Sequence, residues 1–266
     1  MTSREYYQSL TPLYCKLFGH EWHLGYWLNA STLPEAAARL TQLMASRLSV
    51  SEGMTVLDLG CGVGGPACYL AETFGCRVVG LSNSQSGLVE AQRWTAEKHV
   101  RHLVSFLLAD ALELPFPDDN FDAIWSCEAV HNIENAERLA EEVARVLKRA
   151  GTFVMGDIFL LRGAAEEDPE VQRLRNYGFH LVTADRWISL LQKQGITVQE
   201  SSAVGHHVGA QSLRLCTQIC LIEAENHADG SIEKVLCERT AEATSLLWNL
   251  FDRREVSWGI WVGQKL

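Results

Sequence analysis

The sequence predicts an α/β fold built on a doubly wound, mostly parallel sheet of seven strands with helices on both faces. From Thr55 onward, short apolar runs alternate with amphipathic helical stretches. The connections between them are short and polar, as in a parallel sheet that is covered on both sides. The first apolar run, Val56–Leu59, leads into the glycine-rich turn Gly60–Gly65 and then into a helix, which is typical of such folds.

Residues 1–50 precede this alternation, and we expect them to form an N-terminal helical lid segment. Within it, the apolar spacing over Pro34–Leu48 predicts a helix capped by Ser31 or Thr32. Residues 51–266 form the predicted core, with cap segments at about 162–183 and 203–254. The expected strands are Thr55–Leu59, Arg77–Leu81, Val104–Ala109, Phe121–Ser126, Gly151–Leu160, Ile196–Ser201 and Val256–Val262. The expected core helices are Pro66–Phe74, Ser84–Lys98, Ala136–Lys148 and Ala184–Gln194.

Composition excludes several classes of partner. The chain has 266 residues and a formal net charge of −10, which argues against nucleic acid and against an anionic membrane surface, because both need basic residues. Its eight cysteines show neither C-x-x-C pairs nor zinc-ligand spacing, which predicts free thiols and no metal site. Without a leader or a transmembrane-length run, we expect a cytoplasmic protein with no membrane insertion. The N-terminal helix and the tail carry apolar surface suited to a homodimer.

The carboxylate before the glycine-rich turn indicates the charge of the ligand. Gly60, Gly62 and Gly64 let the backbone approach a ligand closely, because no Cβ intervenes. A pyrophosphate would be repelled by Asp58, whereas a cation would be attracted. S-adenosylmethionine (SAM) carries a sulfonium and an ammonium and no phosphate. The block Val56–Pro66 resembles motif I of class I SAM-dependent methyltransferases, which implies a Rossmann-like fold and SAM as cofactor.

Two further stretches resemble the cofactor site of that family. The run Gly80–Gln85 is similar to the variant of sterol, tocopherol and cyclopropane-type methyltransferases, in which hydroxyl and amide side chains hold the ribose. The resemblance assigns this role to Ser82 and Gln85. After the third strand, it implies that Asp110 accepts the adenine amino proton and that the N–H of Ala111 meets the ring.

An aromatic segment before the core resembles a known cofactor cover. His23–Trp27 is similar to the [HF]-x-G-[YF]-W segment that lies over SAM in small-molecule methyltransferases. The resemblance implies that Tyr26 and Trp27 line the cofactor, where aromatic rings exclude water beside a sulfonium. Packing of the N-terminal helices onto the sheet is the alternative for both residues. Candidates for the roof of the substrate pocket are Tyr6, Tyr7 and Tyr14.

The fourth strand ends in a stretch that carries candidate catalytic residues. Glu128-Ala-Val-His131 resembles the E-[SA]-x-x-H element of small-molecule methyltransferases, rebeccamycin-type sugar O-methyltransferases in particular. Members of that group pair this histidine with an aspartate after the fifth strand, where Asp157 stands. Methylation of an alcohol also removes a proton, and an imidazole oriented by a carboxylate suits that task. We expect His131 to be the base and Asp157 its orienting partner, and we expect Glu128 to contact the methionine end of SAM or the lid.

These residues predict a methyltransferase that acts on a small-molecule specialised metabolite, by O-methylation of a hydroxyl. C-methylation of an isoprenoid or another alkene is an alternative, with a carbocation intermediate and with Glu128 or His131 as the base. A prenyl diphosphate substrate would add a need for Mg²⁺ and a basic cluster. The candidates for that cluster are Arg173, Arg175, His180, His206 and His207. A protein that binds SAM without transferring methyl, as a cyclase or a sensor, is the further alternative.

Overall fold

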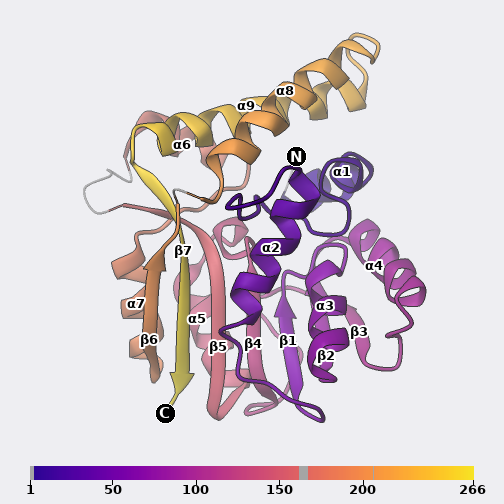
Figure 1. Cartoon of the computed structure of the whole chain (residues 1–266). Helices are drawn as coiled ribbons and strands as arrows, with labels where there is room; N and C mark the ends of the chain where they lie inside the picture. The colour runs from indigo at the N-terminus through magenta and orange to yellow at the C-terminus, as the bar shows by residue number, and fades with distance from the viewer. Residues whose placement is uncertain (1–2, 162–166, 206) are drawn as a thin grey trace.

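The computed structural model describes residues 3–161, 167–205 and 207–266, and of residues 3–8 and 10 it describes the backbone alone (Figure 1). The described residues hold a seven-stranded sheet in the order β3-β2-β1-β4-β5-β7-β6. The strands are β1 (Thr55–Leu59), β2 (Arg77–Ser82), β3 (Val104–Leu108), β4 (Phe121–Cys127), β5 (Leu147–Leu160), β6 (Ile196–Ala203) and β7 (Val256–Lys265). Only β7 among them runs antiparallel to its neighbours. The predicted α/β fold with a mostly parallel sheet of seven strands is confirmed.

The strand order places a crevice at one edge of the sheet. The chain moves outward from β1 through β2 to β3 and then returns to add β4 on the other side of β1. Where the winding direction reverses in this way, the connections leave a crevice at the carboxyl ends of the central strands. Helices α3 and α2 cover one face of the sheet, and α5 and α7 cover the other (Figure 1). The core helices are α3 (Gly65–Phe74), α4 (Gln85–Glu97), α5 (Ala136–Val146) and α7 (Ala184–Lys193).

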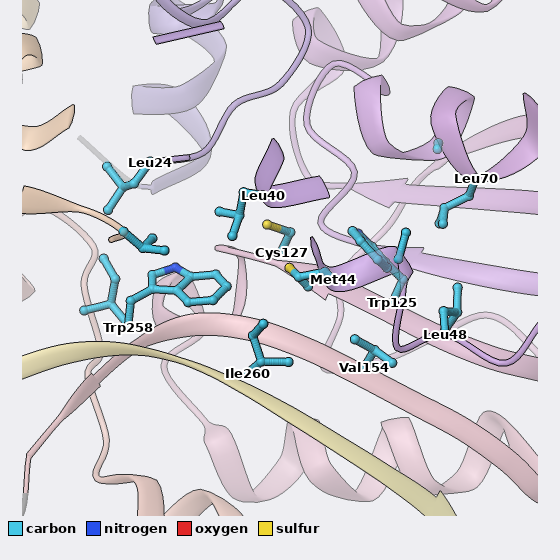
Figure 2. Close-up of a cluster of buried hydrophobic side chains, with 14 of the residues drawn as sticks. Leu24, Leu40, Met44, Leu48, Leu70, Trp125, Cys127, Val154, Trp258 and Ile260 are labelled. Carbon is cyan, nitrogen blue, oxygen red and sulfur yellow. The ribbon is translucent and has the colours of Figure 1, made fainter. Parts of the chain in front are cut away.

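Helix α2 (Leu33–Ala45) is packed on the sheet itself. Thr32 is its N-cap, in a capping box with Glu35, which resolves the choice between Ser31 and Thr32. Figure 2 shows Leu40 and Met44 of α2 directed at the side chains of the sheet, among them Trp258. Leu40 and Met44 are fully buried. Burial of each such side chain stabilises the fold by about 1.5–3 kcal/mol, so α2 belongs to the core packing.

The remaining helices lie near the carboxyl ends of the parallel strands. They are α1 (Ser3–Phe18), the short 3₁₀ helix η1 (Val130–Asn132), α6 (Pro169–Arg175), α8 (Ala210–Glu225) and α9 (Ile232–Asp252). Helices α8 and α9 pack together as a hairpin across this end of the molecule (Figure 1). They occupy the predicted cap segment 203–254, in which His206 lies outside the described residues. In the other predicted cap segment, 162–183, residues 162–166 lie outside them. Within the described chain, no helix is both long and apolar enough to span a bilayer.

Candidate active site

A cavity of about 610 Å³ lies at the crevice between the carboxyl ends of the strands and the helices above them. On one side it is lined by the turns that follow β1, β2 and β3. The predicted residues on this side are Gly60, Gly62, Ser82, Asp110 and Ala111. On the other side it reaches beneath α1, α8 and α9. His131 and Glu128 also line it, so the fold brings residues from many segments to one space.

Gly60 tolerates no side chain in this turn. Its φ is +83°, in the left-handed region, and a Cβ built there would come within 2.2 Å of the Cβ of Ala129. Gly62 also lines the cavity, with φ +52° and Trp22 above it. Gly64 does not reach the cavity wall. It caps α3, and a Cβ there would lie 2.9 Å from the ring of Phe106, so its need for glycine is explained by packing.

Gly60→Ala is expected to weaken SAM binding at least tenfold, because the new methyl group displaces Ala129 and with it the wall beside Glu128. Isothermal titration calorimetry with SAM measures the effect. Gly53→Ala is the matched control, because Gly53 has φ +86° but open space around its missing Cβ. The control variant is destabilised by an alanine in the left-handed region, as Gly60→Ala is, but its new methyl group meets no neighbouring atom. Equal SAM affinities for the two variants would contradict the assignment of Gly60 to the cofactor wall.

Asp58 lies beneath the glycine turn, near the end of β1. It is buried, and its Oδ2 has no hydrogen-bond partner among the described residues. Burial, reinforced by the charge of Glu21, raises the pKa of Asp58 to about 8. A buried acceptor without a partner is costly, and a cationic ligand nearby would relieve that cost. The unpartnered oxygen would suit a nearby cation such as the methionine end of SAM, but Asp58 does not line the cavity, so its contact with SAM stays a prediction.

The ribose and adenine candidates divide into those at the cavity and one outside it. Ser82 and Asp110 both line the cavity, and the Ser82 hydroxyl accepts the N–H of Ser84 at 3.1 Å. Gln85 is exposed and does not line the cavity. Ser84 is the N-cap of α4, so Gln85 is the first residue of the helix and lies outside the cavity wall. Asn83, which the sequence analysis leaves without a role, lines the cavity instead.

Tyr26 and Trp27, which the resemblance assigns to the cofactor, do not line the cavity. Gly25, with φ +78°, turns the chain away and passes so close to α2 that a Cβ would lie 2.6 Å from the backbone of Ala36. The indole N–H of Trp27 donates to the Ser212 hydroxyl of α8 at 2.8 Å. Both aromatic residues therefore pack the N-terminal segment onto its neighbours, as the alternative in the sequence analysis has it.

The residues just before this turn line the cavity in their place. Trp22, His23 and Leu24 all form part of its wall. His23 is buried, and its Nε2 lies 3.0 Å from Oε2 of Glu21 and 3.1 Å from the hydroxyl of Thr41. The side chains of Tyr6 and Tyr7 lie outside the described residues, whereas Tyr14 lines the cavity. The aromatic motif thus reaches the site with its first residues and not with its last two.

His131 and Asp157 form a buried pair at the cavity wall. Nδ1 of His131 lies 2.5 Å from Oδ1 of Asp157, although the residues are 26 positions apart. The other carboxylate oxygen accepts the backbone N–H groups of Val130 at 2.8 Å and of His131 at 3.2 Å. Oδ1 also accepts the N–H of Ile158 at 2.7 Å. A carboxylate that accepts four hydrogen bonds is held rigidly, and it holds the imidazole in turn.

The second ring nitrogen of His131 remains for chemistry. Because the Nδ1 proton is directed at Asp157, the neutral ring carries its lone pair on Nε2. The side-chain amide nitrogen of Asn132 lies 3.0 Å from Nε2 and donates to it. The ring of Phe179 stacks on the imidazole at 4.9 Å between centroids. A hydroxyl that enters the cavity can replace the Asn132 amide at Nε2, where its proton would be accepted.

Glu128 connects three parts of the fold at the cavity. Its carboxyl oxygens accept the N–H of Leu24 at 2.9 and 3.1 Å, and Oε1 also accepts the indole N–H of Trp258 at 2.9 Å. Burial, reinforced by the charge of Asp157, raises its pKa to about 8. The backbone of Glu128 is left-handed, with φ +51°, a strained conformation that clusters at functional sites. Glu128 thereby ties the segment before Gly25 to β4 and β7.

Glu128→Gln is expected to remove part of the pH dependence of folding stability. The pKa of Glu128 is raised from 4.5 to about 8, so between these values the folded state retains a proton that the unfolded state releases. The free energy of unfolding of the wild type therefore falls as pH rises through this window, by an amount on the order of a few kcal/mol, and levels off above it. Glutamine cannot ionise, so the variant gains stability relative to the wild type towards pH 8.

Urea unfolding of both proteins at pH 5, 7 and 9 measures this difference. Glu134→Gln is the control, because Glu134 is an exposed carboxyl on the wall of the same cavity. A wild-type-minus-variant difference for Glu128→Gln that stays constant over this range would contradict the buried, protonated carboxyl.

The basic cluster considered for a diphosphate does not assemble at the cavity. Arg173 forms an ion pair with Glu242, and neither Arg173, Arg175 nor His180 lines the wall. His207 packs edge-on against Tyr26. Over the part of the chain that the structure describes, no group of three His, Cys, Asp or Glu side chains is arranged to hold a metal ion.

Comparison with known proteins places this site in a family. The model of the methyltransferase domain family matches residues 57–155. The chain is 32% identical over 205 residues to the 27-O-demethylrifamycin SV methyltransferase of Amycolatopsis mediterranei, covering 76% of this chain and 75% of that protein. It is 30% identical over 233 residues to a sterol 24-C-methyltransferase of Pneumocystis carinii, covering 88% of this chain and 60% of that protein.

A solved structure shares the whole architecture. The crystal structure of the [4+2]-cyclase SpnF superposes with a TM-score of 0.83 at 25% identity, covering 99% of this chain and 96% of that chain. The matched family domain contains the glycine turn, the second and third strand ends and the His131 segment, which together form much of the cavity wall. These likenesses show that the chain belongs to the class I SAM-dependent methyltransferases.

Proposed function

We propose that the protein transfers a methyl group to a hydroxyl of a small specialised metabolite, with His131 as the general base and Asp157 as its orienting partner. The observation that carries the proposal is the buried 2.5 Å contact between Nδ1 of His131 and Oδ1 of Asp157 at the cavity wall. SAM supplies a methyl group that its sulfonium makes electrophilic. The residues that would hold SAM are Asp58, Gly60, Gly62, Ser82, Asp110 and Ala111.

The chain contributes orientation and proton transfer. Nε2 of His131 accepts the proton of the substrate hydroxyl, and Asp157 stabilises the resulting imidazolium through Nδ1–H. The four hydrogen bonds to Asp157 and the stacked ring of Phe179 hold the base in one orientation, which removes an entropic part of the barrier. The helices α1, α8 and α9 contribute apolar side chains to the cavity wall, so that part of the site offers the reacting groups a less polar environment than water does.

Two observations support oxygen as the acceptor. The name of the rifamycin relative describes methylation of an oxygen, and that relative matches three quarters of this chain. In addition, a lone pair on Nε2 that faces the cavity suits a hydroxyl proton, which must leave as the new C–O bond forms.

Carbon methylation is the second candidate, favoured by Glu128. Its buried carboxyl lines the cavity in a strained backbone conformation, and the sterol relative is named for transfer to carbon. Transfer to an alkene carbon produces a carbocation, which must then lose a proton to a nearby base. In that case Glu128 is the base, and the ring of Trp22 on the wall stabilises the cation.

The test is incubation of the protein with methyl-deuterated SAM and a panel of neutral terpenoid, polyketide and glycoside acceptors, read by mass spectrometry. O-methylation predicts a labelled methyl ether that His131→Ala loses and Glu128→Gln retains. A labelled carbon lost in Glu128→Gln would replace the proposal with the second candidate. Measured SAM binding with no labelled product over the whole panel would argue for a protein that binds SAM without methyl transfer, as the likeness to a cyclase suggests.

A further inference from the structure

The part of the cavity that lies away from the strand turns is lined mainly by apolar side chains. Helix α1 contributes Tyr14 and Phe18, α8 contributes Leu213 and Cys216, and α9 contributes Leu247. We call these five residues the apolar arm. Burial raises the pKa of the Cys216 thiol well above its ordinary value, so the thiol is neutral here. The arm offers a bound molecule dispersion contacts and removal of apolar surface from water.

The two hydroxyls beside the arm are already engaged within α9. The Thr240 hydroxyl donates to the carbonyl oxygen of Leu236 at 2.8 Å. The Thr244 hydroxyl donates to the carbonyl oxygen of Thr240 at 2.8 Å. The Thr244 hydroxyl also lies 2.7 Å from the Thr217 hydroxyl of α8. The hydroxyls of Thr240 and Thr244 thus both donate to carbonyl oxygens of α9, so neither supplies a free donor for an anionic group.

The cavity wall offers an anion no lysine or arginine among the described residues that line it. It instead has the carboxyl groups of Asp110 and Glu134, and the carboxyl of Glu128, whose pKa is raised to about 8 by burial. The described cations of α1, α8 and α9 have other partners. Lys16 forms an ion pair with Glu223 and Lys234 with Asp229, whereas Arg214 lies over the ring of Trp248 and Arg239 over that of Tyr177. A phosphate or diphosphate in the arm would lose its hydration and meet no compensating charge.

The apolar arm lies beside Leu24, because the hydroxyl of Ser212, the neighbour of Leu213, donates to the carbonyl oxygen of Leu24, whose N–H donates to Glu128. His131 lines the same cavity, so a bound molecule can have a hydrocarbon body in the arm and one polar end at Nε2. We infer that the acceptor is an uncharged molecule whose hydrocarbon body fills the apolar arm and whose hydroxyl reaches His131. The reacting hydroxyl rests on the proposed function, whereas the preference for a neutral hydrocarbon body rests on the arm alone. The inference excludes prenyl diphosphates and leaves prenyl alcohols and other neutral amphiphiles.

Binding to the full-length protein saturated with S-adenosylhomocysteine tests this preference separately from catalysis. The probes are 1-octanol, 1-decanol, 1-dodecanol and farnesol, each beside its phosphate ester, with and without Mg²⁺. Quenching of tryptophan fluorescence reports binding, because Trp22 lines the cavity. We expect each added methylene to tighten alcohol binding about three- to fourfold until the arm is full, and each phosphate to bind at least tenfold more weakly than its alcohol.

Two variants locate the binding in the arm. Cys216→Trp fills the arm and is expected to weaken farnesol binding more than tenfold, with S-adenosylhomocysteine binding within twofold of wild type. Leu221→Trp is its matched control, because Leu221 lies on the same helix but is 51% exposed. Thr244→Lys adds a cation beside the arm and is expected to reverse the preference, so that dodecyl phosphate binds more tightly than dodecanol. This variant tests the charge argument even where the larger substitution prevents folding.

Phosphates that bind wild type as tightly as their alcohols, or the failure of every neutral probe to bind, would overturn the inference. Farnesol binding that Cys216→Trp leaves unchanged would do the same. Neutral binding in the arm without any methyl ether in the labelled-SAM assay contradicts the proposed function and leaves the inference standing. If an anionic acceptor is added to the labelled-SAM assay and is methylated on oxygen, the proposed function stands and the inference of a neutral acceptor is overturned.

Discussion

His131→Ala is expected to lower the rate of methyl transfer about 10²- to 10⁴-fold, which is the usual contribution of a positioned general base. Without the imidazole, the hydroxyl proton has no acceptor at the place that Nε2 occupies, and Asp157 is left without the ring it orients. SAM affinity should change little, because the cofactor side of the cavity is built by the turns after β1, β2 and β3. Single-turnover assays with labelled SAM and calorimetry on the same variant separate the two quantities.

His102→Ala is the control for this experiment, because His102 is an exposed histidine in the loop before β3. Its turnover should match wild type. A His131→Ala variant that keeps turnover within threefold of wild type would contradict the assignment of His131 as the base. If Glu128→Gln lost turnover in the same assay, the base would be Glu128. The readings of the two variants therefore discriminate between methylation of oxygen and of carbon.

Asp157→Asn is expected to destabilise the fold by about 1–3 kcal/mol, the usual cost of leaving a buried hydrogen-bond donor without its acceptor. Both oxygens of Asp157 accept hydrogen bonds, from the backbone on one side and from His131 and Ile158 on the other. Whichever way the amide is turned, its NH₂ group faces N–H donors, so buried donors lose their acceptor. Urea unfolding followed by circular dichroism measures the loss, and methyl transfer should fall with the altered orientation of His131.

Glu137→Gln serves as the comparison, because Glu137 forms an exposed ion pair with Lys193. Such surface pairs contribute little, so its unfolding midpoint should stay near that of wild type. If Asp157→Asn unfolds at the same urea concentration as Glu137→Gln, the four hydrogen bonds do not stabilise the folded state as argued. Loss of activity at full stability would then assign Asp157 to orientation of the base alone.

Local patterns in the chain were sufficient for the elements of the core. The bounds of Thr55–Leu59 are the same in prediction and structure, and the helix after Thr32 begins within one residue of its expected start. Short apolar runs and capping residues act over a few neighbours, so they can be read from the sequence. Helices α8 and α9 were not predicted, because their buried side chains include cysteine, threonine, serine and alanine, which weaken the apolar periodicity.

For the site, too, local motifs were sufficient to locate some residues and not others. The motifs locate Gly60, Ser82, Asp110 and His131 at strand ends, and parallel strands bring those ends to one edge of the sheet. Asp58, Gly64, Gln85, Tyr26 and Trp27 belong to the same motifs but do not line the cavity. Asp58 is buried in β1, and Gly64 packs against Phe106 at the start of α3. Gln85 stands at the start of α4, and Tyr26 and Trp27 follow the turn at Gly25.

The sequence by itself determined the fold class, the cofactor class and the candidate base, because each depends on residues that are close together in the chain. Only the tertiary structure decided that His131 contacts Asp157, that Glu128 holds the segment at Leu24, and that α1, α8 and α9 meet to form the apolar arm. These contacts join segments 26 to more than 200 residues apart, between Tyr14 and Leu247 at the widest. Strand order and helix packing create them, and neither is encoded in any single stretch of the chain.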